Sequence, residues 1–241
     1  MSLSPLALHT LFDSLAWLAA AATAFLIARW RPLAFPVAPA MRQSYLAALV
    51  FGAAIGAYVF GTLNLWASGQ EGIARSIEGA LAGGILGVEG YKRWTGLSAR
   101  TGARYAAPLA IGVAVGRIGC FFAGLEDFTY GVATTLPWAH DFGDGVARHP
   151  VQLYESAAMA LFLVAYLAAL ARRAVFITAN GFYLAVLWYG AQRFVWEFLK
   201  PYGAVAGPLT VFHLLSLALV AYAAFMLCAG AQTVEPAPDK A

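Results

Sequence analysis

Charged residues are scarce in this sequence. Asp, Glu, Lys and Arg together make up 11% of its 241 residues, whereas soluble domains carry about 25%. Hydrophobic residues make up 61%, and the mean hydropathy is +0.71. A water-soluble core cannot bury this much apolar surface. The composition therefore excludes an ordinary soluble domain and indicates an integral membrane protein.

Cysteine is equally rare, with only Cys120 and Cys228, and both lie in apolar stretches. This placement argues against an extracellular disulfide. The first ten residues, MSLSPLALHT, contain no Lys or Arg, unlike the start of a secretory signal, so we expect the first apolar segment to be retained. The net charge of +3 is modest, and no nucleic-acid partner is expected.

Seven apolar stretches are each compatible with a membrane-spanning helix of about 20 residues. They cover residues 6–28, 44–66, 77–91, 105–123, 150–171, 176–199 and 208–230. The pattern predicts an all-α polytopic membrane protein of about seven transmembrane helices. We expect a single helical domain over residues 1–230 and a disordered cytoplasmic tail over residues 231–241, which is polar and contains proline.

The loops between these stretches differ in basic residues. One set of alternate loops holds nine: Arg29, Arg31, Arg42, Lys92, Arg93, Arg100, Arg104, Arg172 and Arg173. The other set holds three: Arg75, Arg148 and Lys200. Cytoplasmic loops carry the excess of Lys and Arg. The pattern therefore predicts that the N-terminus lies outside and the C-terminus in the cytoplasm.

Several ionisable residues fall in or near the apolar stretches: Asp13, Glu78, Glu89, Arg117, Glu155, Arg193 and Glu197. A charge at the bilayer centre costs about 2.5–3.5 kcal/mol on insertion scales, so such residues should face a polar interior and find partners. In the predicted orientation Arg117, Glu155 and Arg193 all lie toward the outer ends of their helices. We expect them to converge on one polar pocket, where two guanidinium groups would suit a phosphate.

A purely structural role is an alternative for some of these residues. Arg193 and Glu197 are four residues apart and share a helix face, which is equally typical of a structural clamp. His9 and Asp13 are also four apart, and a helix-internal hydrogen bond is favoured over a metal site, so no metal ligand is assigned. His213 is expected to be a buried core histidine. The glycines spaced by four, such as Gly52 and Gly56, Gly83 and Gly87, are expected to allow close helix packing.

Three segments, in order, resemble a known family. They are GRIG with a following F-x-x-G-x-E segment (116–126), HPVQLYE (149–155) and RFVWEFLKP (193–201). In this order they resemble the bacterial prolipoprotein diacylglyceryl transferases. The resemblance implies a multi-pass protein of the bacterial inner membrane that needs no cofactor. It also implies transfer of the diacylglyceryl group of phosphatidylglycerol to the cysteine thiol of a lipoprotein precursor, or of another acceptor, with release of glycerol phosphate.

The resemblance also implies roles for individual residues, and it names phosphatidylglycerol and a lipoprotein signal peptide as partners. Catalytic roles fall to Arg117, Glu155, Arg193 and Glu126, and substrate-binding roles to His149, Gln152, Tyr154, Gly131 and Glu197. In this assignment the arginines hold the lipid phosphate, and their positive charge stabilises the departing phosphate.

The chain departs from the family pattern at three positions. The family signature G-N-F-x-N-G has Cys120 and Ala123 in place of its two asparagines, and Ala82 stands where the family has a histidine. A thiol acceptor must lose its proton to become a nucleophile, and Glu155, Glu126 and His149 are the candidate bases. Cys120 as a nucleophile is less favoured than Cys120 as a small buried residue.

These departures leave three functional classes open. The first is a transferase. The second is a non-catalytic phospholipid-binding or lipid-transport protein that keeps the phosphate pocket. The third is a structural membrane subunit whose charges only hold its helices together.

Overall fold

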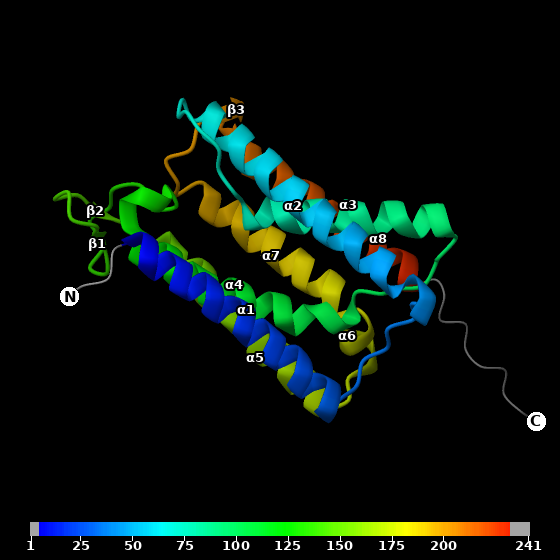
Figure 1. Ribbon diagram of the computed structural model, residues 1–241. Helices are drawn as coiled ribbons and strands as arrows, with labels where there is room; N and C mark the ends of the chain where they lie inside the picture. Colours follow the sequence, from blue (N-terminus) through cyan, green and yellow to red (C-terminus); the bar gives the residue numbers. More distant parts are fainter. Residues whose placement is uncertain (1–4, 232–241) are drawn as a thin grey trace, which may run out of the picture.

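The computed structural model describes residues 5–231 and is mostly helical (Figure 1). Its α-helices are α1 (Pro5–Trp30), α2 (Arg42–Ala67), α3 (Ile77–Thr95), α4 (Ala106–Ala123), α5 (Val151–Ala171), α6 (Val175–Ala179), α7 (Gly181–Glu197) and α8 (Val211–Ala231). Three short 3-10 helices are η1 (Pro39–Met41), η2 (Ala103–Tyr105) and η3 (Gly124–Asp127). The predicted tail, apart from residue 231, lies outside the described residues.

A helix lies at each of the seven predicted stretches, and one of these predictions needs correction. The stretch 176–199 was predicted as one helix, but it is broken at Asn180 into α6 and α7. The Asn180 side chain donates to Phe176 O at 2.9 Å and accepts from Arg100 Nη1 at 2.5 Å. At the next residue, a Cβ added to Gly181 would lie 2.4 Å from the Tyr166 ring. The break therefore serves a close contact with α5 that only glycine permits.

Membrane-spanning character is clear for most of these helices. Within residues 5–231, five segments are long and apolar enough to cross a membrane: Ala7–Trp30, Pro39–Ala67, Ala103–Asp127, Val151–Ala171 and Val211–Ala229. Helices α3 and α7 are not among them, and both carry buried polar and charged side chains. The chain is a multi-pass membrane protein, because several separate helices share this length and composition.

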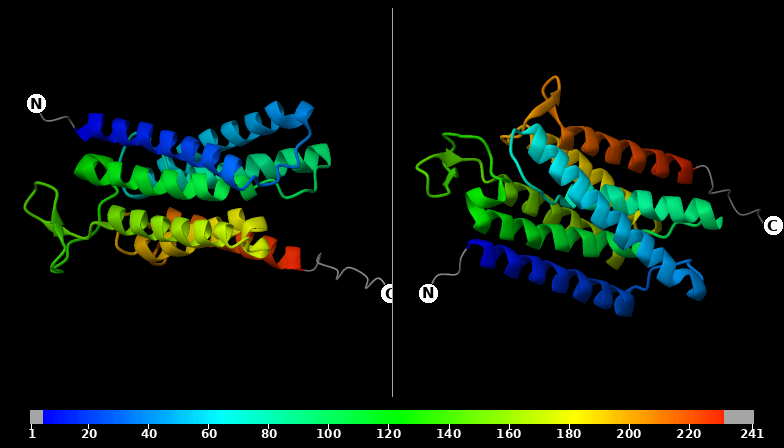
Figure 2. Two further views of the ribbon diagram at one scale, coloured as in Figure 1. Left: turned by 90° about the horizontal axis from the view of Figure 1, so that it is seen from below. Right: turned by 45° about the horizontal axis from the view of Figure 1, so that its top comes forward.

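Two small antiparallel β-hairpins add to the helical fold, and the sequence pattern did not predict them. Strands β1 (His140–Asp141) and β2 (Ala147–Arg148) pair with His140 opposite Arg148. Strands β3 (Ala204–Ala206) and β4 (Leu209–Thr210) pair with Ala204 opposite Thr210. The β1–β2 hairpin lies at the same end of the bundle as the start of α1, and the end of α8 lies at the opposite end (Figure 2).

Helices α2 and α3 pack with their backbones almost in contact. A Cβ added to Gly83 would lie 2.2 Å from Gly52 O, and one added to Gly56 would lie 2.3 Å from Gly79 O. Both distances are shorter than any real carbon–oxygen contact. The predicted packing role of these glycines is confirmed, since any larger residue would force the two helices apart.

The connection from α2 to α3 folds back into the bundle. Ser76 N donates to Ala57 O at 3.0 Å, so α3 begins level with the middle of α2 rather than at its end. Ser76 Oγ caps α3 by accepting from Gly79 N at 3.2 Å. The first turn of α3 therefore lies in the interior, and it places Glu78 there with no solvent exposure.

Candidate active site

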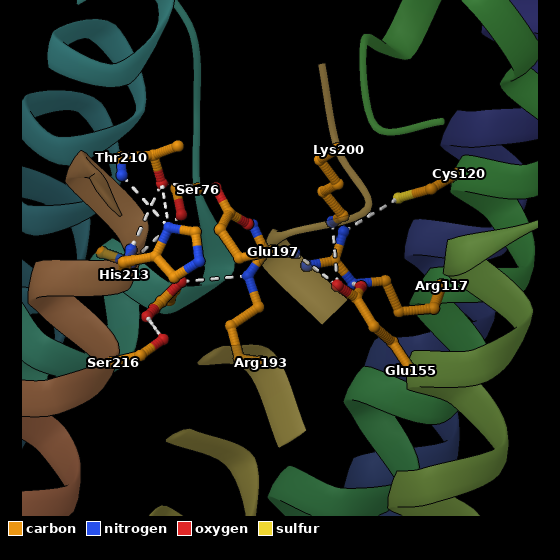
Figure 3. Close-up of polar contacts among 12 residues, drawn as sticks. Ser76, Arg117, Cys120, Glu155, Arg193, Glu197, Lys200, Thr210, His213 and Ser216 are labelled. Atoms are coloured by element: carbon orange, nitrogen blue, oxygen red, sulfur yellow. Dashed lines mark hydrogen bonds and ion pairs between the residues drawn. The ribbon is translucent and has the colours of Figure 1, made fainter. Parts of the chain in front are cut away.

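Arg193 on α7 is the centre of a buried ionic network (Figure 3). Its side chain is only 2% exposed, and it contacts three carboxylates. Nε donates to Glu78 Oε2 at 3.0 Å, Nη1 donates to Glu155 Oε1, and Nη2 lies 3.1 Å from Glu197 Oε2. The i, i+4 pair with Glu197 is therefore real, but it is one of three contacts. The network joins α3, α5 and α7, which a clamp within one helix would not do.

Glu155 on α5 is the second hub. Its Oε2 lies 2.5 Å from Arg117 Nε, and its Oε1 is shared by Arg193 Nη1 and Lys200 Nζ, the latter at 2.8 Å. The expected convergence of Arg117 and Arg193, from α4 and α7, is confirmed, because both bind the same carboxylate. Three cations around one carboxylate stabilise its charged form, which makes Glu155 a poor proton acceptor.

Hydroxyl groups from β4 and α8 donate hydrogen bonds to the other two carboxylates. Ser216 Oγ donates to Glu78 Oε1 at 2.6 Å, and Thr210 Oγ1 donates to Glu197 Oε1 at 2.8 Å. His213 is buried, as predicted, and its Nδ1 accepts from Thr210 N at 3.1 Å. Buried charges persist only when they are paired and hydrogen-bonded in this way.

Arg117 has spare donor capacity. It uses Nε for Glu155, and the contact of Nη1 is the Cys120 sulfur at 3.9 Å. Within residues 5–231, neither terminal nitrogen of Arg117 has an oxygen acceptor. A guanidinium with its two-pronged edge open is suited to bidentate binding of phosphate oxygens.

Further buried polar atoms beside the network are also without a partner. In the described part of the chain, Gln152 Oε1, Tyr189 Oη and Trp196 Nε1 make no hydrogen bond. An unpaired buried polar group costs about 1–3 kcal/mol. A polar ligand that reached these atoms would satisfy them.

The predicted substrate-binding residues His149, Tyr154 and Gly131 form a separate hydrogen-bonded cluster nearer the surface. His149 Nδ1 lies 3.3 Å from Tyr154 Oη, which accepts from Trp138 Nε1 at 2.7 Å. Gly131 N donates to His149 O at 3.1 Å, and a Cβ on Gly131 would lie 2.5 Å from that oxygen. This cluster fixes the loop before α5 to the start of that helix. Its role in binding substrate stays a prediction.

The acidic pair after α4 divides in an unexpected way. Glu126 is exposed and makes no side-chain hydrogen bond or ion pair within residues 5–231, whereas Asp127 turns inward. Asp127 Oδ1 lies 3.3 Å from His9 Nε2 on α1. The acid that lies near Cys120 and Arg117 is therefore Asp127. The sequence interpretation assigned Glu126 as the best match to the acidic residue of the family signature, with Asp127 adjacent to it, and its catalytic role stays a prediction.

Sequence reasoning passed over two members of the network. Glu78 was expected among the ionisable residues that need partners but was given no role in the site, and Lys200 was counted as a loop charge although its side chain is fully buried. Lys200 lies three residues beyond the end of α7, directly before Pro201. Only the turn made there shows that its ammonium group points back to Glu155.

Fold and site together define a multi-pass membrane protein with a buried arginine–carboxylate network beneath one end of its helices. Residues 3–229 match the sequence model of a family described as prolipoprotein diacylglyceryl transferase. The chain belongs to this family.

Three relatives bear the name phosphatidylglycerol–prolipoprotein diacylglyceryl transferase. The Methylococcus capsulatus protein is 30% identical, over 95% of this chain and 93% of its own length. The Geobacter sulfurreducens protein is 32% identical, over 70% of this chain and 68% of its own. The Pseudomonas aeruginosa protein is 32% identical, over 83% of this chain and 79% of its own.

Proposed function

We propose that this protein is a phosphatidylglycerol-dependent diacylglyceryl transferase. It moves the diacylglyceryl group to the cysteine thiol of a lipoprotein precursor or of another molecule. The observation that carries the proposal is that Arg117 and Arg193 contact the same carboxylate, Glu155. This arrangement leaves the terminal nitrogens of Arg117 available to a phosphate. Membership in the family supports the same activity. The non-catalytic alternatives have no comparable support.

The reaction forms a carbon–sulfur bond and breaks a carbon–oxygen bond. The acceptor sulfur attacks the glyceryl carbon of the lipid, and the bonding electron pair leaves with the phosphate oxygen of glycerol phosphate. Negative charge grows on that phosphate as the bond breaks. Arg117 is the group placed to stabilise it, since charge stabilisation in a water-poor site is worth more than in water. Arg193 and Lys200 hold Glu155, and Glu155 holds Arg117 at its Nε.

The proposal includes an orientation in the membrane. With the basic loops in the cytoplasm, the network lies toward the outer leaflet of the bacterial inner membrane, the N-terminus is outside and the C-terminus is in the cytoplasm. Helices α3 and α7 then count as the third and sixth of seven spans in one domain. Their low apolar content reflects the buried charges they bring to the site.

The test is an assay of glycerol phosphate release from labelled phosphatidylglycerol, with a lipobox cysteine peptide as acceptor. Arg117→Lys should lower the rate on the order of 100-fold or more, because a lysine ammonium cannot make the bidentate contact. Arg193→Lys should also lower it, through loss of its three-way contact. Arg172→Lys, an exposed arginine at the opposite end of α5, is the matched control and should release glycerol phosphate at the wild-type rate.

The outcomes separate a transferase from a lipid-binding protein. Release that depends on the peptide supports lipoprotein modification. Release with a membrane extract but not with the peptide would indicate another acceptor. Retention of phosphatidylglycerol without any release would favour a lipid-binding protein. Unchanged release in Arg117→Lys would refute the proposed role of the site.

A further inference from the structure

A second cluster of reactive side chains lies beside Arg117, outside the network described above. His9 on α1, Cys120 on α4 and Asp127 on η3 each direct one potential ligand atom to a common point, and these atoms lie within 4.8 Å of one another. His9 Nε2 is 3.3 Å from Asp127 Oδ1 and 3.8 Å from Cys120 Sγ. The three residues are partly buried and come from three separate elements.

The close approach of α1 and α4 makes this cluster possible. A Cβ added to Gly119 would lie 2.5 Å from Phe12 Cβ, so only glycine lets the two helices meet at this level. The rings of Phe12 and Phe122 stack with centroids 5.4 Å apart. His9 is thereby held one turn from Phe12 and opposite Cys120.

Each of the three facing atoms can donate an electron pair to a cation once the imidazole nitrogen and the thiol that face it have lost their protons. Without a metal, a proton on His9 Nε2 would be shared with Asp127, and the Cys120 sulfur would keep its contact with Arg117 Nη1 at 3.9 Å. A tetrahedral zinc ion, with bonds of about 2.0–2.1 Å to nitrogen and oxygen and about 2.3 Å to sulfur, separates its ligands by roughly 3.3–3.6 Å. The His9–Asp127 separation of 3.3 Å already matches this range, the His9–Cys120 separation of 3.8 Å is slightly longer, and all three atoms lie within 4.8 Å of one another, so the ligands would draw together around the ion. We propose that His9, Cys120 and Asp127 bind a zinc ion.

Neighbouring groups orient two of the three ligands. Asp13 Oδ2 lies 3.3 Å from His9 Nδ1, an arrangement in which Nδ1–H donates to the carboxylate and the Nε2 lone pair faces the cluster. Thr129 Oγ1 donates to Asp127 Oδ2 at 2.8 Å, which leaves Oδ1 for the metal. Carboxylate partners behind a metal-bound histidine are characteristic of zinc sites. A thiolate with an imidazole favours zinc over the hard cations magnesium and calcium.

Three protein ligands leave the fourth position of a tetrahedral zinc open, as in catalytic rather than structural sites. The position lies beside the proposed phosphate site, since Cys120 Sγ is 3.9 Å from Arg117 Nη1. This part of the inference rests on the proposed transferase function. An acceptor thiol that binds zinc there loses its proton to bulk water. The resulting thiolate attacks the glyceryl carbon, and the carbon–oxygen bond to phosphate breaks with its electron pair on glycerol phosphate.

Such a site answers the question of how the acceptor is deprotonated. The family histidine is Ala82 in this chain, and Glu155 is bound by three cations. The residue that replaces a signature asparagine is Cys120, one of the three proposed ligands. Two departures from the family pattern thus fit a single chemical change, from a histidine base to a metal-activated thiol.

The first test measures metal binding without any substrate. Purified protein in detergent is loaded with Zn²⁺ or Co²⁺, and bound metal is measured by elemental analysis and by the thiolate-to-cobalt absorption band. Wild type and Cys228→Ser, the matched control at the exposed second cysteine, should each bind one equivalent and show the band. Cys120→Ser should lose the band, and Asp13→Asn, which keeps all three ligands, should bind 10–100-fold more weakly.

Equal Co²⁺ binding without the band in wild type and Cys120→Ser would overturn the site and favour an imidazolium bridge between Asp13 and Asp127. Asp13 is half-exposed, so Asp13→Asn is expected to fold. Its weaker metal binding keeps the test decisive if Cys120→Ser fails to fold.

The second test separates the metal from the transferase proposal. Chelator-stripped wild type should lose more than 10-fold in transfer rate and recover with Zn²⁺. Metal binding with transfer unaffected by stripping would overturn the thiol-activating role. Transfer by a protein that binds no metal would overturn the zinc site and leave the transferase standing. Metal binding with no transfer under any condition would count against the proposed function and not against the zinc site.

Discussion

The carboxylate of Glu155 offers the sharpest test of the buried network. Glu155→Gln keeps the size of the side chain and removes its charge. In the part of the chain that the structure describes, Glu155 is the one charged partner of both Arg117 and Lys200, and both would lose it. Arg193 would keep Glu78 and Glu197. The substitution thus leaves two buried cations uncompensated without creating a cavity.

The expected cost follows from this count. Removal of one partner from a buried ion pair costs about 3–5 kcal/mol, because the other charge stays buried without compensation. The amide oxygen of glutamine can still accept one hydrogen bond, so we expect the lower end of that range. A loss of about 3 kcal/mol corresponds to a change on the order of 100-fold in the folding equilibrium.

The assay is unfolding in mixed detergent micelles with increasing SDS, followed by loss of tertiary signal. Glu71→Gln is the matched control, since Glu71 is exposed in the loop before α3. A double-mutant cycle with Arg117→Gln should give a coupling energy of about 0.5–3 kcal/mol. If Glu155→Gln unfolds at the same SDS fraction as Glu71→Gln, or if the double-mutant cycle gives no coupling energy, the network does not stabilise the fold as argued.

Further predictions concern helix packing and the β1–β2 loop. Gly83→Ala should destabilise the protein by about 2 kcal/mol or more, since its Cβ would meet Gly52 O at 2.2 Å; Gly90→Ala, with open space around it, should be neutral or stabilising by up to about 1 kcal/mol in the same SDS titration. Arg148 donates to both oxygens of Asp144, at 2.6 and 2.7 Å, and holds the pKa of Asp144 below its ordinary value. The β1–β2 loop should therefore keep its hydrogen-exchange protection above the ordinary carboxylate pKa and lose it as pH falls through the lowered pKa. Arg148→Gln should move that loss to higher pH, and an unmoved midpoint would refute the link.

Much of the helical framework could be predicted because each helix carries its own signal. Apolar length placed all seven long helices, and glycine spacing identified the contact of α2 with α3. The convergence of Arg117 with Arg193 also followed, since charges in apolar helices need partners and topology put both at one end. The break at Asn180 carried no such local signal, because it depends on the close contact of Gly181 with Tyr166 on another helix.

The sequence by itself determined that this chain is a multi-pass membrane protein, which family it belongs to, and which arginines needed a partner. Apolar runs, charge placement and motif order are properties of the linear chain. Only the tertiary structure decided that α3 starts inside the bundle, that Lys200 turns back to Glu155, and that His9 meets Cys120 and Asp127. These contacts join residues far apart in the chain, and they depend on how closely helices approach and where loops fold back, which no local pattern of residues encodes.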